Sequence, residues 1–174
     1  MNTEIKNQIL KDLADLIAIN SMTIINANSK DLSNCDKSDE ALYDRLKVDE
    51  NKIKSMQLSV LKVRHMPDPE GEILYSYEKE PGLNIENKVV PFGTILIIYE
   101  SRPDVTIEAA ITAFKAGNKI LLKGGKEAKY SNLALVDIWK QALEKNQQDI
   151  NIVKYLDYNL LYLDSDYYYE MSRN

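Results

Sequence analysis

The sequence predicts an α/β protein in which N-terminal helices and a β-hairpin precede a Rossmann-like parallel βαβ unit. Three observations lead to this fold class. Apolar residues recur at helical spacing over residues 2–28, a Pro-Gly pair separates two β-like stretches within 73–90, and two apolar strands flank a helix within 93–153. A strand, a helix and a strand at this spacing require parallel strands joined by a right-handed crossover.

The helical part is expected over residues 1–66, beginning with one long amphipathic helix at 2–28. Its apolar positions follow one another at intervals of three, four or seven residues, as in Ile5, Ile9, Leu13, Leu16, Ile17 and Ile24. Residues 28–40 are rich in Ser, Asp and Asn, and they predict a loop. A short helix is expected within 38–46.

A further helix is expected after Asp49, whose carboxylate can cap it. Four apolar residues share one face of this helix, which should end before Pro67: Ile53, Met56, Val60 and Val63. The hairpin follows, with Pro81 and Gly82 suited to the central positions of a type II turn.

The βαβ unit begins with Thr94–Tyr99, a nearly continuous apolar run that predicts a strand covered on both faces. The helix over 105–116 should end at Gly117, because glycine readily adopts the positive φ of that position. Its inward side chains are expected to be Ala109, Ala110, Ala113 and Phe114. The second strand is expected at 119–122, another helix at 131–144 and a third strand within 149–156.

Composition narrows the class of protein. The 174 residues fit one soluble globular domain, and a net charge of −5 with a pI near 5.0 argues against a nucleic-acid binder. The N-terminus lacks the pattern of a secretory signal, and no apolar run is long enough to span a membrane. Cys35 is the only cysteine, so neither a disulfide nor a zinc framework is expected. These features predict a cytoplasmic protein without a metal site.

Two polar loops follow the first two predicted parallel strands. "YESRPD" contains Ser101 and Arg102, and "KGGKEA" contains Lys123, Gly124, Gly125, Lys126 and Glu127. Ligands bind beyond the carboxyl ends of the strands in such sheets, so we expect both loops at one binding edge. For "KGGKEA" the alternatives are a phosphate or dinucleotide contact, through glycines and a helix N-terminus, and a plain turn with solvated lysines.

The first loop also has two interpretations. The planar guanidinium of Arg102 suits an anionic substrate. Alternatively, Arg102 pairs with Glu100 or Glu108 while Asp104 caps the following helix.

No residue type in the sequence identifies a nucleophile. His65, the only histidine, is expected on the surface near a helix C-terminus, and Cys35 lies in a polar region without a basic neighbour. Trp139 and Tyr130 are expected in the core or at its edge. Neither a Walker A motif nor G-x-G-x-x-G is present. Residue patterns alone therefore predict an α/β protein with a phosphate-binding edge.

The amino-acid sequences of several segments resemble those of a known family. "VPFGTILIIYESRPDVTIEAAITAFKAGNKILLKGGKEAKYSN", "INANSKDL", "ALYDRLKVDENKI" and "MPDPEGEILYSYEKEPGLNIENKVVPFG" are similar to γ-glutamyl phosphate reductases of the aldehyde dehydrogenase superfamily. The resemblance extends over roughly residues 1–145. It implies NADPH-dependent reduction of L-glutamyl 5-phosphate to L-glutamate 5-semialdehyde in proline biosynthesis, through a cysteine thiolate that attacks the acyl phosphate.

The resemblance also assigns the two loops. It places Ser101 and Arg102 near the nicotinamide and the acyl phosphate, and residues 123–127 against the adenosine side of NADPH. Relatives that use NAD tend to carry an acidic residue where Lys126 stands here, and a cation suits the 2′-phosphate of NADPH.

The differences between this sequence and the family change the activity that we expect of it. Family members are more than twice as long, and their catalytic cysteine lies beyond the matched segment. We therefore expect a truncated N-terminal portion: residues 1–155 would form part of an NADP-binding domain, inactive alone. Its expected partners are a second copy bound through the 73–90 hairpin or a missing catalytic half. A non-catalytic nucleotide-binding or protein-interaction fragment is the alternative, and residues 156–174 form an unassigned tyrosine-rich tail.

Overall fold

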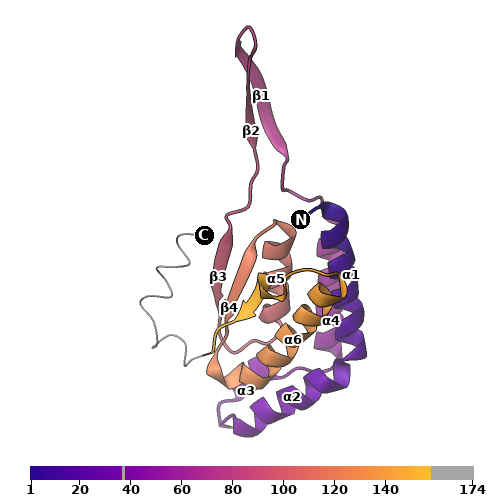
Figure 1. The fold of residues 1–174 in the computed structure, drawn as a ribbon. Helices are drawn as coiled ribbons and strands as arrows, with labels where there is room; N and C mark the ends of the chain where they lie inside the picture. The colour runs from indigo at the N-terminus through magenta and orange to yellow at the C-terminus, as the bar shows by residue number, and fades with distance from the viewer. Residues whose placement is uncertain (37, 158–174) are drawn as a thin grey trace.

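The computed structural model describes residues 1–36 and 38–157, which form a layered α/β body with a projecting two-stranded hairpin (Figure 1). This arrangement of helices, an antiparallel pair and a parallel sheet confirms the predicted fold class. In chain order, the elements are α1 (Thr3–Ile19), α2 (Ser21–Asn34), α3 (Glu40–Leu46), α4 (Glu50–His65), β1 (Ile73–Glu80), β2 (Leu83–Lys88), β3 (Thr94–Ile98), α5 (Val105–Lys115), β4 (Lys119–Lys123), η1 (Lys126–Ala128), α6 (Lys129–Lys145), η2 (Ile150–Ile152) and β5 (Val153–Tyr155).

Three layers enclose the core. Helices α5 and α6 pack against the sheet, α1 and α4 form an outer layer on them, and α2 runs along α6 (Figure 1). The centre of the core is aromatic: the rings of Phe114 and Trp139 meet edge to face, with centroids 5.4 Å apart. Trp139 is fully buried, as expected from the sequence.

The long N-terminal helix expected over 2–28 is divided at Asn20, so that prediction is wrong. The side-chain amide of Asn20 donates to the carbonyl of Leu16 at 2.9 Å, and its φ of −93° and ψ of 16° interrupt the helix. The expected loop at 28–40 is also wrong in its first half, because α2 continues to Asn34. Buried hydrogen bonds of Asn28 and Asp31 to residues far along the chain override the local preference for a loop.

The next two helices match the prediction. Helix α3 lies within the expected segment, and the carboxylate of Asp39 accepts from the N–H of Leu42 at its start. The carboxylate of Asp49 accepts from the N–H of Lys52 at 2.9 Å and caps α4. All four apolar residues assigned to the inner face of α4 are buried.

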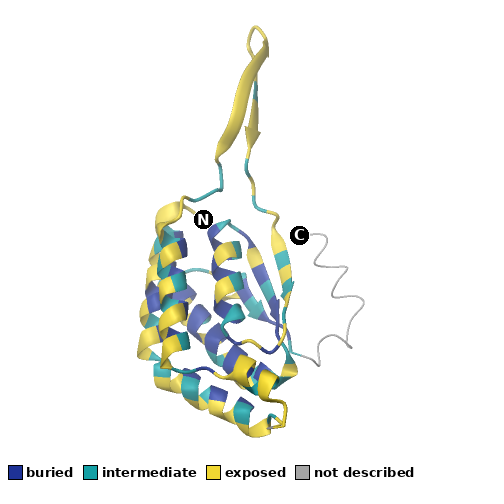
Figure 2. Cartoon of the chain, turned by 180° about the vertical axis from the view of Figure 1, so that it is seen from behind, coloured by how far each residue is buried: buried dark blue, intermediate teal, exposed yellow. Residues whose placement is uncertain are grey.

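The predicted hairpin is confirmed as the antiparallel pair of β1 and β2. Gly82 has a φ of 87°, which the third residue of a type II turn requires. The two strands are exposed along nearly their whole length (Figure 2). At the base of the hairpin, the buried ammonium of Lys6 lies 3.0 Å from the carboxylate of Asp68, which ties α1 to the segment before β1.

The predicted βαβ unit is also confirmed. β3 and β4 are parallel and in register from Thr94 opposite Lys119 to Ile98 opposite Lys123, and β5 pairs in parallel with the other side of β4. Gly117 has a φ of 85° and ends α5 as expected. Of the side chains expected to face inward on α5, two are buried and two are half-buried: Ala110 and Phe114, then Ala109 and Ala113.

One prediction about the sheet is wrong. The strand at 94–99 was expected to be covered on both faces, but its side chains alternate between half-buried and exposed (Figure 2). Leu96 is 41% and Ile98 73% exposed, because α5 and α6 cover only the face that bears Ile97.

Within the described ranges, no helix is both long enough and apolar enough to span a membrane. Of the predicted tyrosine-rich tail, residues 158–174 lie outside the part of the chain that the structure describes.

Candidate functional site

The two polar loops meet at the carboxyl edge of the sheet, as their positions after adjacent parallel strands predict. The hydroxyl of Ser101, in the loop after β3, donates to the Oε2 atom of Glu127, after β4, at 2.7 Å. Ser101 is buried and Glu127 is half-buried, whereas Arg102 and Lys126 are exposed. The structure therefore joins Ser101 and Glu127 directly by a hydrogen bond. The residues next to them in sequence, Arg102 and Lys126, face the solvent.

The first loop differs from both ion pairs suggested by the sequence. Arg102 lies 3.6 Å from a carboxylate oxygen of Asp104, and Glu100 pairs instead with Arg45 of α3 at 3.2 Å. Asp104 precedes α5 but its side chain makes no capping hydrogen bond, so the expected cap is also wrong. Its backbone is already helical, with φ −56° and ψ −34°, which is not the extended geometry of a side-chain cap.

The glycine pair of the second loop is required for space. A Cβ on Gly124 would overlap the amide of Asn132 and meet the ring of Tyr99 at 3.0 Å. A Cβ on Gly125 would overlap the Ser101 hydroxyl. Gly125 itself has a φ of −60°, which any residue can adopt. The glycines therefore allow the loops to approach each other, an internal reason that sequence alone did not suggest.

The lysines around this loop have different environments. Lys123 is buried at the end of β4, and burial lowers the pKa of its ammonium group while the negative charge of Asp157 opposes that shift. The ammonium of Lys129 lies 2.8 Å from a carboxylate oxygen of Asp157, a hydrogen bond that raises the pKa of Lys129. Lys126 is exposed on the η1 turn. The loop thus presents an accessible cation at the sheet edge.

The N-terminus of α6 already holds an anion, the carboxylate of Asp31. Its oxygens accept from the N–H of Tyr130 at 3.0 Å and from the N–H and hydroxyl of Ser131 at 2.8 and 2.6 Å. Negative charge at a helix N-terminus is stabilising, because the first N–H groups lack helical acceptors. These two N–H groups donate to the protein's own carboxylate, so a phosphate at this edge would depend on other donors.

Asn28, one turn before Asp31 in α2, stabilises the same contact between α2 and α6. Its amide nitrogen donates to the carbonyl of Leu46 and to the Ser131 hydroxyl, and its oxygen accepts from the N–H of Val48. Sequence reasoning missed Asn28 and Asp31 because they stand in a polar segment. A signal was present, since both continue the three-to-four spacing of the buried stripe that includes Ile24.

A buried polar chain lies behind the glycine pair. The hydroxyl groups of Tyr99 and Thr106 are 2.7 Å apart, and Thr106 donates to the side-chain oxygen of Asn132 at 2.8 Å. The amide nitrogen of Asn132 donates in turn to the hydroxyl of Tyr155 at 3.4 Å. Burial raises the pKa of Tyr99, so its phenol stays protonated at neutral pH. This chain of hydrogen bonds fixes the strand ends from which the loops emerge.

The two residues dismissed as catalytic lie as expected. His65 is exposed at the end of α4, with its Nδ1 atom 2.6 Å from the carbonyl oxygen of Leu61. Burial, followed by the charges of Asp39 and Asp36, raises the pKa of the Cys35 thiol. A raised pKa disfavours the thiolate, which is the nucleophilic form.

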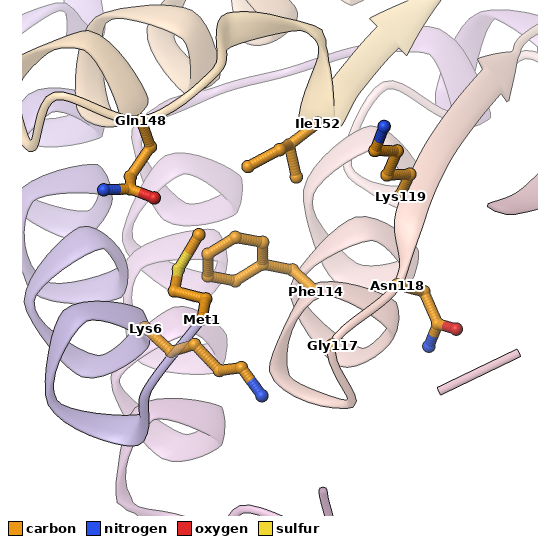
Figure 3. Close-up of a pocket in the computed structure, with 8 residues that line it drawn as sticks. All are labelled: Met1, Lys6, Phe114, Gly117, Asn118, Lys119, Gln148 and Ile152. Carbon is orange, nitrogen blue, oxygen red and sulfur yellow. The ribbon is translucent and has the colours of Figure 1, made fainter. Parts of the chain in front are cut away.

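A pocket of about 290 Å³ lies at the opposite edge of the sheet (Figure 3). Phe114, Ile152 and the Met1 side chain line it, beside Lys119 at the start of β4. Its one buried cation, Lys6, is committed to the carboxylates of Asp68 and Glu70. This pocket is therefore separate from the two loops that resemblance assigns to ligands.

Comparison with known proteins gives a consistent picture. No protein-family model matches the chain. Curated γ-glutamyl phosphate reductases are similar over most of it: one from Nautilia profundicola is 43% identical over 162 residues, covering 91% of this chain and 39% of the relative. Another, from Sulfurovum sp., is 41% identical over 143 residues, covering 81% of this chain and 35% of the relative.

Solved structures agree. The chain superimposes on the γ-glutamyl phosphate reductase of Thermotoga maritima with a TM-score of 0.88 and 36% identity, over 92% of this chain and 40% of the other. A propionaldehyde dehydrogenase from Clostridium phytofermentans, at 14% identity and a TM-score of 0.56, shares the fold over 89% of this chain and 33% of its own. The chain is therefore homologous to part of the γ-glutamyl phosphate reductases and spans about 39% of the length of a curated relative.

Proposed function

We propose that this chain supplies the cofactor-side portion of a γ-glutamyl phosphate reductase, which reduces L-glutamyl 5-phosphate to L-glutamate 5-semialdehyde with NADPH. The similarity to curated reductases over 91% of the chain is the observation that supports this most. In this proposal, residues 1–155 are part of an NADP-binding domain in a cytoplasmic enzyme of proline biosynthesis.

On the cofactor side, we assign residues 123–127 to the adenosine end of NADPH, which supplies the hydride when bound. The ammonium of Lys126 fits a 2′-phosphate, because opposite charges attract. Lys126 is already exposed, so a ligand can reach it without any change in the backbone. The occupied N-terminus of α6 supports a contact through side chains, since the N–H groups of Tyr130 and Ser131 already donate to Asp31.

On the substrate side, we assign Ser101 and Arg102 to the acyl-phosphate end. Arg102 suits this role because its side chain is 55% exposed and only loosely paired with Asp104 at 3.6 Å. The planar guanidinium can donate two parallel N–H hydrogen bonds to the oxygens of a phosphate. Ser101 contributes by fixing the loop, since its hydroxyl is already bonded to Glu127.

The attacking thiolate is not assigned to this chain. Cys35 is its only cysteine, and it lies at the end of α2. Burial, together with neighbouring carboxylates, raises the pKa of its thiol. We therefore propose that the isolated chain binds NADPH without turnover. Activity would require a polypeptide that carries the remaining portion of the enzyme, and the exposed hairpin at 73–90 is the proposed contact for a second copy.

The test uses three samples: the full 174-residue chain, its Lys126→Glu variant, and the chain mixed with the complementary portion of the Nautilia profundicola relative. Calorimetry should show NADPH binding to the chain and at least tenfold weaker binding to the variant. NADPH oxidation with glutamyl phosphate should appear only in the mixture. Turnover by the chain alone would contradict the assignment of the nucleophile elsewhere, and absence of NADPH binding would contradict the cofactor assignment.

A non-catalytic interaction module is the second candidate. The exposed apolar side chains of β3 and the hairpin support it, because aromatic and apolar residues are enriched where proteins meet. A stoichiometric complex that forms without any NADPH affinity would support this candidate over the first.

A further inference from the structure

Glu127 is the one carboxylate in a loop that carries several lysines, and its position is fixed from outside that loop. The hydroxyl of Ser101 donates to its Oε2 atom at 2.7 Å across 26 residues of sequence. Ser101 is only 7% exposed, so its side chain has little freedom to release this bond to water.

Gly125 provides the space in which the two groups meet. A Cβ built on Gly125 would lie 2.9 Å from the same Glu127 oxygen and 3.1 Å from the Ser101 backbone nitrogen, and it would overlap the Ser101 hydroxyl. The Glu127 carboxylate is therefore folded back over Gly125 toward the loop that follows β3. The backbone of Gly125, with φ −60° and ψ 147°, gives no other reason for a glycine there.

This arrangement leaves Lys126 without compensation from its neighbour. Among the residues that the structure describes, the carboxylate of Glu127 forms no ion pair with Lys126 or Lys129. Lys129 pairs instead with Asp157 at 2.8 Å. A carboxylate released from Ser101 would be free to approach the Lys126 ammonium and would lower the affinity of that cation for an anionic ligand.

We propose that Ser101 is a positioning residue that holds the Glu127 carboxylate away from Lys126, so that the loop prefers a nucleotide with a 2′-phosphate over one without it. This inference rests on the proposed NADPH contact of Lys126. It gives the buried Ser101 a role in cofactor selection through Glu127, in addition to the acyl-phosphate side to which resemblance assigns its loop.

The test compares adenosine 2′,5′-bisphosphate with adenosine 5′-monophosphate as calorimetric probes on the full chain. The ratio of their dissociation constants isolates the 2′-phosphate. Four proteins form a cycle: the wild type, Ser101→Ala, Glu127→Gln and the double variant. Ser101→Ala should lower the preference for the bisphosphate about two- to fivefold, the range of an exposed charge pair. The double variant should regain the preference of Glu127→Gln, because no charge remains to be released.

Gly125→Ala provides an independent variant if Ser101→Ala folds poorly. Its methyl group enters between the Ser101 hydroxyl and the Glu127 carboxylate, so it should lower the preference in the same direction. The carbon NMR signal of the Glu127 carboxylate, compared between the wild type and Ser101→Ala at one fixed pH, reports the loss of the hydrogen bond without any ligand. A role limited to stability would leave the ratio of the two affinities unchanged.

The outcomes separate this inference from the proposed function. A wild type that binds neither probe overturns the cofactor assignment and this inference with it. A wild type that prefers the bisphosphate equally with and without Ser101 overturns only the inference. A reduced preference in Ser101→Ala that fails to recover in the double variant also overturns it, because the effect would then not pass through the charge of Glu127.

Discussion

The apolar side chains on the two faces of the three-stranded sheet have opposite surroundings, and only the less covered face also carries lysines, namely Lys119, Lys123 and Lys154. On one face, Ile120, Leu122 and Val153 are fully buried beneath α5 and α6. On the other, Leu96 is 41% and Ile98 73% exposed, although both are as apolar as their counterparts.

The difference shows which part of the apolar pattern this chain satisfies by itself. Strands of parallel sheets are normally apolar throughout because helices cover both faces. Here the helices of the chain cover one face only, and Leu96 and Ile98 on the second face remain exposed. The chain spans 35–39% of the length of these curated relatives.

The same substitution on the two faces should have the largest difference in effect. Ile120→Ala removes a fully buried side chain from β4 and should lower the free energy of unfolding by about 2–5 kcal/mol. Ile98→Ala is the matched control and should cost less than about 1 kcal/mol, since most of its surface is already in water. Urea denaturation at neutral pH measures both. Equal losses would mean that the second face is packed within the isolated chain.

Removing Asp31 tests the buried hydrogen bonds that join α2 to the N-terminus of α6. Asp31→Ala leaves two helix N–H groups and the Ser131 hydroxyl without their acceptor, and should cost about 2–4 kcal/mol. Added phosphate should restore part of the melting temperature of the variant, by occupying the vacated N-terminus of α6, and should not raise that of the wild type to the same extent.

Asp137→Ala serves as the control for Asp31. It lies on α6, the helix whose N-terminus Asp31 holds, and its side chain is 64% exposed in a 3.4 Å pair with Lys140. Its removal should change the free energy of unfolding by less than about 0.5 kcal/mol. If both variants behaved alike, the buried junction between α2 and α6 would not form in solution.

Much of the fold could be predicted because it depends on local signals. The Asp49 cap, the Pro81-Gly82 turn and the glycine that ends α5 are each specified by a few neighbouring residues. The βαβ topology followed from spacing, and it placed the two loops at one edge correctly.

The errors concern contacts between distant segments. Asn28 and Asp31 stabilise the second half of α2 through partners up to about a hundred residues away, and local composition could not indicate them. Whether a face of β3 is covered depends on the elements that pack on it, whereas the sequence of the strand shows only that its side chains are apolar. The Ser101–Glu127 bond needed the register of β3 with β4.

Acid titration tests the helical layers that close the covered face. Burial alone would raise the pKa of Asp12, but hydrogen bonds from Lys145, Asn146 and Gln8 outweigh burial and lower its pKa below the usual value near 3.8. A lowered pKa in the folded state stabilises the protein above the unfolded value, and this contribution is lost as the pH falls through the folded value.

Asp12→Asn should therefore weaken the chain at pH 7 and make its stability less dependent on pH below about 4. Urea denaturation between pH 7 and pH 2.5 measures the slope, with the exposed Asp15→Asn as control. The expected loss is smaller than for Asp31, because Lys145 is 60% exposed and solvent partly replaces it. A slope identical in the wild type and Asp12→Asn would show that α1 is not held to α6 by this carboxylate.

The smallest change in stability is expected at Phe92, just before β3. Its side chain is 93% exposed, so Phe92→Ser should alter the free energy of unfolding by less than about 0.5 kcal/mol. An exposed aromatic residue just before β3 is nevertheless suited to a partner surface, and the substitution should weaken association with the complementary polypeptide in sedimentation velocity. A loss above about 1 kcal/mol in the isolated chain would show that the ring is packed on its own chain. In that case the surface at the start of β3 would be closed from within the chain, and the exposed ring would not mark a contact with another polypeptide.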